Sequence, residues 1–395
     1  MDGSSARPRA EIAAWPLEFT GTGGEYFRVW IVNLLLTIVT LGFYTPLARR
    51  RTAQYFYGHT MVADSPLEFT AQTKRMLVGF VLFVALYAAF KFAAETGQDT
   101  TVAVMLVGGA VLAPYFWASA MRFRFNATRW RGVRLQFTAK WGEVYRASWP
   151  VFAFAAIWAV GFSLIERYIP KARGTGSIGA ALGIGLACGI LSILCAIRLE
   201  YNYKSLMVAR GRIGGQPGRW KPQFGDFVRI WLATLGVFLL AVIVVWLVIF
   251  LMFGGYIAAF KGVKDGGMRA VMLGIALGVV ALFLLFLASA PARAYREARM
   301  FQLVWNNIGV SSVARFKCRL QPWRYVRLRV KNVILSLLTL GFYRPFAKVS
   351  EYRMKTDSVT LHVKGGLDQL AGQLAREELA VGDAFADAVG LELVG

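Results

Sequence analysis

The sequence has few of the residues from which enzymatic and metal sites are built. Only 3 cysteines and 2 histidines occur among its 395 residues. His59 and His362 have no acid or nucleophile at the spacing of a catalytic triad, and no set of zinc ligands accompanies them. Cys188, Cys195 and Cys318 match neither a disulfide framework nor a metal-binding motif. We therefore expect no catalytic residues, no metal and no cofactor, and we expect that the protein is not an enzyme.

Charged residues are absent from six long apolar stretches. Hydrophobic residues make up 57% of the chain and charged residues 17%, a composition typical of membrane proteins. About 20 apolar residues are enough for a helix to cross the hydrocarbon core. A transporter coupled to protons or sodium normally has a carboxylate near the membrane midplane, so the absence of charge disfavours that class. The six predicted spans are 76–90, 102–121, 148–165, 178–197, 230–253 and 270–290.

Acidic residues are also scarce, and the excess of basic residues follows the expected membrane topology. The chain has 45 Lys and Arg against 22 Asp and Glu, a net charge of +23. The positive-inside rule places the most basic loops in the cytoplasm. There, each cation near the surface contributes about 1 kcal/mol of attraction to anionic lipid. We expect membrane lipids with anionic headgroups as partners, consider an envelope protein as a second class of partner, and expect no nucleic acid. The loops 48–75, 122–147, 198–229 and 293–328 contain 5, 7, 7 and 8 Lys and Arg, whereas 92–101, 167–174 and 255–269 contain 0, 3 and 3.

One hydrophobic segment occurs twice, near the two ends of the chain. Residues 26–48 read YFRVWIVNLLLTIVTLGFYTPLA and residues 325–347 read YVRLRVKNVILSLLTLGFYRPFA, with 11 of 23 positions identical. Helical spacing puts the polar residues of each copy on one stripe. This stripe lines a pathway or a lipid-headgroup site in one hypothesis; in the other, which we favour, it forms hydrogen bonds between helices. The matched polar residues are Asn33, Thr37, Thr40 and Tyr44 in the first copy and Asn332, Ser336, Thr339 and Tyr343 in the second.

The duplicated segments have two interpretations that the sequence leaves open. About 19 apolar residues in a row favour a simple crossing of the membrane. A crossing, however, places the amino terminus outside, although the segment before it matches a cytoplasmic one. The alternative is a re-entrant element, with a helix to about Leu41, a break at 42–46 and a return to the same face. Glycine and proline in the break suit this alternative.

Short segments between the apolar stretches have the pattern of β-hairpins. Residues 57–71 align without gaps on 125–139, and both alternate apolar and polar residues around residues that favour turns. The predicted fold is an all-α membrane protein, a polytopic bundle of tandem helical hairpins with 6 to 8 hydrophobic segments and a small cytoplasmic β-rich layer. The predicted segments are 1–27 (cytoplasmic), 28–48 (first duplicated element), 49–75 (β-hairpin), 76–121 (hairpin 1), 122–147 (β-hairpin), 148–197 (hairpin 2), 198–229 (cytoplasmic), 230–292 (hairpin 3), 293–328 (cytoplasmic), 329–348 (second duplicated element) and 349–395 (β segment and acidic tail).

A Gly-Glu-x-x-Arg motif precedes several predicted helices. A carboxylate near a helix start interacts favourably with the positive end of the helix dipole. The corresponding carboxylate is missing ahead of the last duplicated segment, which argues against a catalytic role shared by all copies. We interpret the acidic members as helix starts or as partners for loop arginines. The pairs are Glu25 with Arg28, Glu143 with Arg146, and Asp226 with Arg229.

Five further features resemble one known family over essentially the whole chain. They are Phe-Thr-Gly-x-Gly-Gly-Glu-Tyr-Phe-Arg at 19–28, Leu-Gly-x-Tyr-x-Pro-x-Ala at 41–48, Tyr-Phe-Tyr-Gly at 55–58, Phe-x-Phe-Asn at 123–126 and an acidic ending. With these motifs the chain resembles the YjgN-like family of bacterial inner-membrane proteins, a domain of unknown function. The resemblance implies a multi-pass inner-membrane location and supplies no catalytic residues. We expect a non-enzymatic protein that acts through lipid or envelope-protein interaction; the alternative is an uncoupled transporter or channel with a pathway between the two duplicated segments.

Overall fold

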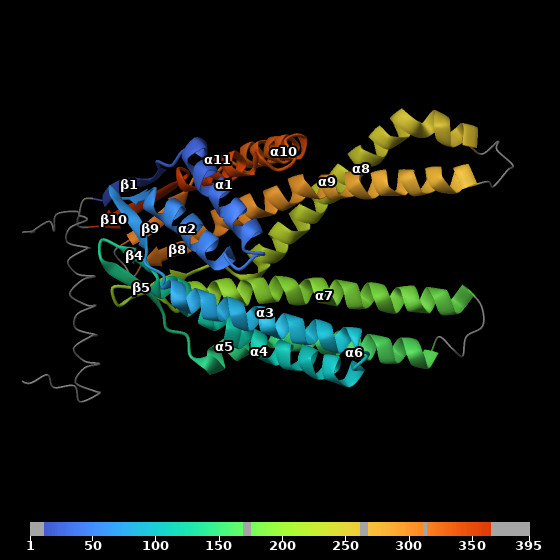
Figure 1. Cartoon of the computed structure of the whole chain (residues 1–395), viewed down its shortest axis with the longest axis horizontal. Coiled ribbons are helices and arrows are strands. Elements are labelled where there is room, and N and C mark those ends of the chain that lie inside the picture. The colour runs from blue at the N-terminus through green and yellow to red at the C-terminus, as the bar shows by residue number, and fades with distance from the viewer. Residues whose placement is uncertain (1–11, 169–174, 261–267, 311–313, 365–395) are drawn as a thin grey trace, which may run out of the picture.

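The chain repeats one structural pattern five times. The computed structural model describes residues 12–168, 175–260, 268–310 and 314–364, so the acidic tail and the first part of segment 1–27 lie outside the described residues. Each unit consists of a strand, a helical hairpin and a second strand, and the third unit has an additional short helix, α5, before its hairpin. The helices of every unit project from the same side of the strands (Figure 1). The units are β1 (Ile12–Phe19), α1 (Gly23–Val39), α2 (Thr45–Gly58), β2 (Thr60–Val62); β3 (Ser65–Phe69), α3 (Thr73–Glu95), α4 (Asp99–Asn126), β4 (Thr128–Trp130); β5 (Val133–Phe137), α5 (Trp141–Ala147), α6 (Trp149–Tyr168), α7 (Thr175–Ala209), β6 (Gly211–Ile213); β7 (Gln216–Trp220), α8 (Phe224–Phe260), α9 (Met268–Asn307), β8 (Ile308–Val310); and β9 (Ala314–Cys318), α10 (Pro322–Leu338), α11 (Arg344–Thr356), β10 (Val359–Lys364).

The ten strands form a closed antiparallel barrel. Each strand pairs with its neighbours in the chain, and β1 pairs with β10 to close the circle, with Trp15 opposite Leu361. Within units 1 to 4, the last strand of one unit and the first of the next form a hairpin. The two-residue turns of these three hairpins have positive φ at both residues, for example 48° at Arg131 and 80° at Gly132, as the favoured hairpin turns require. Closure leaves no unpaired strand edge.

The closed barrel shows that the predicted small cytoplasmic β-rich layer, and with it the all-α fold class, was wrong. The individual strands are only three to eight residues long, so each is a weak signal in the sequence. Isolated two-stranded hairpins are marginally stable. Their assembly depends on pairs such as Ala14 with His362, whose separation in sequence no local pattern reveals.

The barrel is apolar inside and basic outside, because side chains alternate between the two faces of a strand. Leu67 lies opposite Trp130 and Leu135 opposite Ile213, and these side chains share the inner face. The residues between these positions face outward. Among them, Arg129 on β4 lies opposite Glu68 on β3 and opposite Arg134 on β5. The inner face thus resembles a hydrophobic core, and the outer face carries much of the positive charge of the loops.

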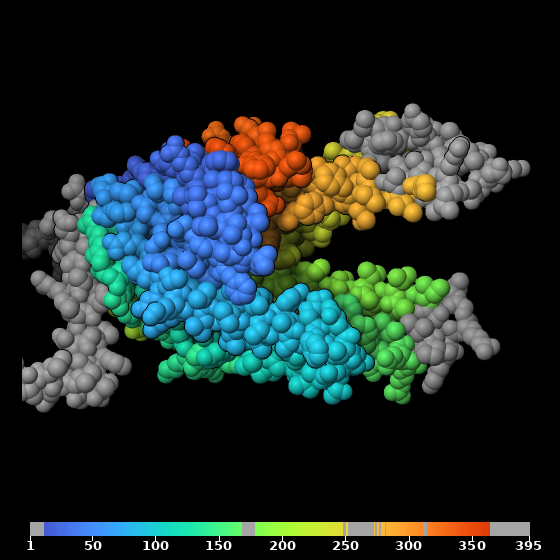
Figure 2. Space-filling model, in the orientation of Figure 1, coloured from blue at the N-terminus to red at the C-terminus, as the bar shows by residue number. Residues whose placement is uncertain are grey.

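The six predicted membrane spans are confirmed as α3, α4, α6, α7, α8 and α9, the helices of the described chain that are long and apolar enough to cross a membrane. They form three hairpins, and away from the barrel the hairpin of α8 and α9 lies apart from those of α3–α4 and α6–α7 (Figures 1 and 2). Only 6% to 24% of the apolar window of each helix is buried within the protein. The surface of these hairpins is therefore mainly suited to contact lipid.

The two duplicated segments form short helical hairpins that return to the side from which they start. Helices α1 and α2 contain 17 and 14 residues, and β1 before them pairs with β2 after them. At 1.5 Å per residue the two helices are about 25 and 21 Å long. The structure therefore agrees with the re-entrant interpretation. The turn is the same in both copies, with φ of 49° and 93° at Leu41 and Gly42 and of 50° and 96° at Leu340 and Gly341.

The first and last units pack against each other where the barrel closes. Helices α1 and α11 are in contact, and the rings of Phe27 and Phe346 are stacked with their centroids 5.7 Å apart. The backbone N–H of Phe19 donates to Asp357 Oδ1 at 3.0 Å, and Arg353 Nη2 donates to the carbonyl of Gly21 at 2.7 Å. Aromatic packing and polar contacts thus hold the two ends of the described chain together.

Candidate functional site

The two asparagines of the duplicated segments each connect the two helices of their hairpin. Asn33 Nδ2 donates to the carbonyl of Ala48 at 3.4 Å, and Asn332 Nδ2 donates to the carbonyl of Ala347 at 3.3 Å. Both asparagines are buried. The shared contact is therefore a hydrogen bond between the two helices of one hairpin.

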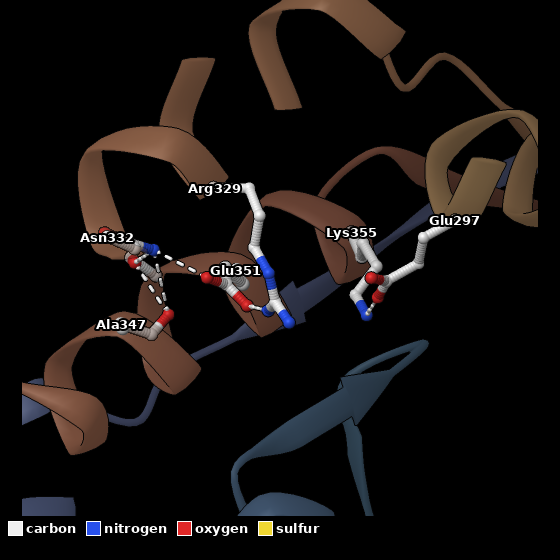
Figure 3. A network of polar contacts seen from close by, with 7 residues as sticks. Glu297, Arg329, Asn332, Ala347, Glu351 and Lys355 are labelled. Carbon is white, nitrogen blue, oxygen red and sulfur yellow. Dashed lines mark hydrogen bonds and ion pairs between the residues drawn. The ribbon is translucent and has the colours of Figure 1, made fainter. Parts of the chain in front are cut away.

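The second copy adds a buried carboxylate to this contact (Figure 3). Asn332 Nδ2 also lies 2.9 Å from Glu351 Oε1, and the other oxygen of Glu351 is paired with Arg329. Close by, Lys355 Nζ donates to Glu297 Oε1 at 2.7 Å. In the first copy Thr52 stands at the position of Glu351, so that copy lacks this ion pair. Glu351 lies four residues beyond the duplicated segment 325–347 and is not shared by the first copy, so the repeat gives no signal for it.

The threonines of the predicted polar stripe bond to their own helix and turn. Thr37 Oγ1 donates to the carbonyl of Asn33 at 2.6 Å, and Thr40 Oγ1 accepts from the backbone N–H of Tyr44 at 3.0 Å. Thr339 accepts from the N–H of Tyr343 at the same distance. At Ser336, the backbone carbonyl accepts from the N–H of Gly341 at 2.7 Å. These residues shape the tip of each hairpin, and none of the three cavities described below is lined by any of them.

The acidic residues of the repeated motif lie at helix starts. Glu25 Oε2 accepts from the backbone N–H of Thr22 at 3.1 Å, and Thr22 Oγ1 accepts from the N–H of Glu25. The backbone contact is the main cause that lowers the pKa of Glu25 below its ordinary value. Burial raises the pKa of the neighbouring Tyr55, whose hydroxyl donates to the carbonyl of Thr22, to about 12.

The other two carboxylates repeat this geometry. Glu143 Oε2 accepts from the N–H of Lys140 at 3.0 Å, which lowers the pKa of Glu143, and its second oxygen is paired with Arg210. Asp226 Oδ2 accepts from the N–H of Gln223 at 2.9 Å. The ion pairs found among the described residues do not include the arginines of the motif, Arg28, Arg146 and Arg229.

Four arginines converge on a cavity outside the barrel, between strands β4 and β5 and helices α3 and α4. We call this cavity the arginine pocket; its volume is about 860 Å³. No Asp or Glu is among the described residues that line it. It lies where the span of α3 begins and that of α4 ends, which is the expected level of lipid headgroups. The four arginines are Arg75, Arg122, Arg129 and Arg134.

Two of these arginines differ in how the fold satisfies them. Arg122 Nη2 donates to the carbonyl of Ala139 at 2.7 Å, and its guanidinium lies 3.9 Å from the ring centroid of Trp141. Arg129 Nε is buried and has no hydrogen-bond partner among the described residues. Burying a donor without a partner is unfavourable, so this group is available for an acceptor that the protein does not provide.

Comparison with known proteins connects this architecture with one family. The family model described as "Bacterial protein of unknown function (DUF898)" matches residues 14–388. The chain belongs to this family. It is 23% identical to the inner membrane protein YjgN of Salmonella typhimurium over 361 residues, which cover 90% of this chain and 89% of the relative. It is 26% identical to YjgN of Escherichia coli O157:H7 and 27% identical to YjgN of Escherichia coli K12, over 46% of each chain. No solved structure matches it.

Membership in the DUF898 family and the six membrane-capable helices establish a multi-pass protein of the bacterial inner membrane. The resemblance found from the motifs is confirmed. The family description assigns no activity, so the arginine pocket has to be interpreted from its own chemistry. The sequence did not predict the pocket. A signal was present, because Arg129 and Arg134 are polar, outward-facing residues on the two strands of one predicted β-hairpin.

Proposed function

We propose that this DUF898 protein is a non-enzymatic lipid-binding protein, whose arginine pocket binds the phosphate of an anionic phospholipid headgroup. The observation that carries the proposal is the convergence of four arginines at the end of two membrane spans, in a cavity without a lining carboxylate. Guanidinium groups bind phosphate through two parallel hydrogen bonds. The distribution of basic residues supports a position of the barrel and the pocket at the cytoplasmic face.

Both attraction and specificity favour an anionic headgroup in this pocket. Each cation near the membrane surface contributes about 1 kcal/mol to the attraction of anionic lipid. Glu68 on β3 lies opposite Arg129 on β4, so the positive charge of Arg129 has one carboxylate neighbour outside the pocket lining. A zwitterionic headgroup brings its own ammonium group towards four guanidinium groups, and the like charges repel. Anionic phospholipids are therefore the expected ligands.

The alternative hypothesis, a pathway between the duplicated segments, gains no support from the described cavities. A polar cavity that reached both Asn33 and Asn332 would favour transport, but neither residue lines one of the three cavities. Instead, the hairpins meet through rings such as Trp30 and Phe342, whose centroids are 6.2 Å apart. We therefore retain lipid binding as the proposed function.

Retention of lipid by the purified full chain tests this proposal. The protein is incorporated into nanodiscs with equal amounts of phosphatidylglycerol and phosphatidylethanolamine, released into detergent, and the bound lipid is counted by native mass spectrometry. The pocket variant is Arg75→Gln with Arg129→Gln. Loss of about 2 kcal/mol from two cations corresponds to binding that is roughly tenfold to thirtyfold weaker.

The matched control is Arg212→Gln with Arg219→Gln, which removes the same charge from strands β6 and β7 outside the pocket. We expect the control to retain phosphatidylglycerol as the unmodified protein does. If both double variants lose phosphatidylglycerol equally, the effect is one of net charge alone, and the pocket is not a specific site. Equal retention of the two lipids by the unmodified protein overturns the preference for anionic headgroups.

A further inference from the structure

The interior of the barrel contains a cavity that its side chains do not fill. We call it the lumen; its volume is about 580 Å³, within the range of about 300–1,000 Å³ that is typical of sites for one small ligand. Nine of the ten strands contribute side chains to its lining, and most of them are apolar. The principal wall residues are Leu17, Leu67, Trp130, Leu135, Ile213 and Phe316.

The floor of the lumen is built from the ends of the returning helices in all five units. The helix that returns to the barrel ends directly below it, and each of the five returning helices contributes at least one side chain from its last two turns. A site that every repeat lines is a property of the assembled barrel and not of one loop. The five helices contribute Tyr57 (α2), Phe125 (α4), Met207 (α7), Trp305 (α9) and Tyr352 (α11).

Two cations interrupt this apolar lining on the side of the membrane. Lys355 lies at the floor and is held by Glu297, as Figure 3 shows. Arg124 is exposed and has no ion pair among those found in the described residues. No carboxylate is among the described residues that line the lumen. An apolar chamber with one available guanidinium at its edge matches a molecule with a hydrocarbon chain and an anionic end.

Arg124 also connects the lumen with the surface that faces the bilayer. A second cavity of about 700 Å³ lies between α2, α3 and α4, and Arg124 and Tyr57 line both cavities. On its outer side this cavity is lined by Phe80 and Phe83 of the membrane span α3. The side chains of Tyr57 and Arg124 thus separate the lumen from a groove at the depth of the lipid chains.

We propose that the lumen binds a single-chain amphiphile with an anionic end: the hydrocarbon chain lies among the apolar residues of the barrel, and the carboxylate or phosphate contacts Arg124. The molecule enters sideways from the membrane, past Tyr57. Burial of the hydrocarbon chain among apolar side chains provides the affinity, and Arg124 selects the end group. This site is separate from the arginine pocket and does not depend on the function proposed for it.

Photo-crosslinking of the full chain in nanodiscs tests this inference. The probe is a palmitic acid with a diazirine in its chain, and labelled peptides are identified by mass spectrometry. We expect labels on strands that form the lumen, in particular on the peptides that contain Trp130 and Phe316. Ile213→Trp fills the lumen and is expected to remove these labels, whereas Leu239→Trp, on the exposed face of span α8, leaves them unchanged. Leu135→Phe is a smaller substitution for the case in which Ile213→Trp does not fold.

Competition experiments identify the end group and its partner. Unlabelled palmitate and a single-chain lysophosphatidic acid are expected to displace the probe, and hexadecanol is expected to do so about tenfold less well, since it lacks the charge. Arg124→Gln removes the difference between palmitate and hexadecanol, whereas Arg212→Gln preserves it. The relative potencies of palmitate and lysophosphatidic acid distinguish a carboxylate from a phosphate ligand.

Two results overturn the inference. In the first, the probe labels only the outer surfaces of the spans, and Ile213→Trp and Leu135→Phe leave the pattern unchanged. In the second, hexadecanol competes as well as palmitate in the unmodified protein. The variant Arg75→Gln with Arg129→Gln leaves the lumen intact, so loss of phosphatidylglycerol retention in that variant with unchanged labelling separates the two sites.

Discussion

At the scale of single residues, polar side chains mainly complete the helical hairpins on which the two proposed sites rest. Asn33 and Asn332 occupy equivalent positions but differ in their surroundings. The side-chain amide of Asn33 donates one hydrogen bond, of 3.4 Å, whereas that of Asn332 also donates to Ser350 and to the buried Glu351. Removing a partner from a buried charged group costs more than removing a single neutral hydrogen bond.

We predict that Asn332→Ala destabilises the protein more than Asn33→Ala. The first substitution removes a donor from the carboxylate of Glu351 and is expected to cost about 1–3 kcal/mol, and the second about 1 kcal/mol or less. Thermal unfolding in detergent, followed by tryptophan fluorescence, gives the two changes in Tm. Equal changes contradict the importance of Glu351, and Asn332→Ala with Glu351→Gln is expected to recover part of the loss.

The helix-start carboxylates predict a dependence of stability on pH. Hydrogen bonding lowers the pKa of Glu25 in the folded protein. A carboxyl group whose pKa is lower in the folded state stabilises that state above its unfolded pKa, and this contribution is lost as the pH falls through its folded pKa. We expect Glu25→Gln to lower Tm at neutral pH, and the difference from the unmodified protein to disappear at acidic pH. A difference in Tm that persists unchanged after the carboxyl group of Glu25 has become protonated excludes this explanation.

At the scale of elements, the turn of each duplicated hairpin decides whether the segment crosses or returns. Gly42 has φ of +93° and Gly341 of +96°, a region that other residues adopt only with strain. The helix after each turn begins with a Pro in its first turn, where proline is compatible with a helix start. These local features were visible in the sequence, and the choice between crossing and return became clear only when β1 was found beside β2.

We predict that Gly42→Ala and Gly341→Ala each destabilise the protein by about 1–2 kcal/mol, since alanine is strained in the left-handed region. The expected decrease in Tm is about 2–4 °C per kcal/mol for a chain of roughly 150–250 residues and smaller for a longer one. The control is Gly79→Ala in α3, a helical position where an added Cβ meets nothing within 4 Å. An equal decrease for Gly79→Ala contradicts the role assigned to the turns.

At the scale of the whole molecule, five repeated units surround one barrel and present different helices to the membrane. Units 2, 3 and 4 carry long membrane hairpins, and units 1 and 5 carry short ones that meet where the barrel closes. The arginine pocket forms where unit 2 meets unit 3, and the lumen requires all five units. Closure of the barrel is therefore a condition for the site proposed inside it.

An engineered disulfide between β1 and β10, the two strands that close the barrel, tests closure directly. Ala14 and His362 are partners in the β1–β10 register, and cross-strand partners have Cβ atoms about 4.5–5.5 Å apart. In a variant without native cysteines, Ala14→Cys with His362→Cys is expected to form a disulfide on mild oxidation, detected as altered mobility in a non-reducing gel. Ala14→Cys with Arg315→Cys, one strand further away, is the control and is expected to remain reduced. Failure of the first pair to oxidise, or equal oxidation of both, contradicts the closed seam.

The sequence by itself determined the features that depend on neighbours in the chain: the six spans, the duplicated segments and the helix-start position of Glu25. Apolar length, helical spacing and turn chemistry act locally, so a single sequence shows them. Only the tertiary structure decided how the short strands assemble, because pairs such as Trp15 with Leu361 join residues far apart in the chain. The same closure turns alternate strand positions into an apolar lumen and a basic exterior, and so creates both cavities from residues that no local motif connects.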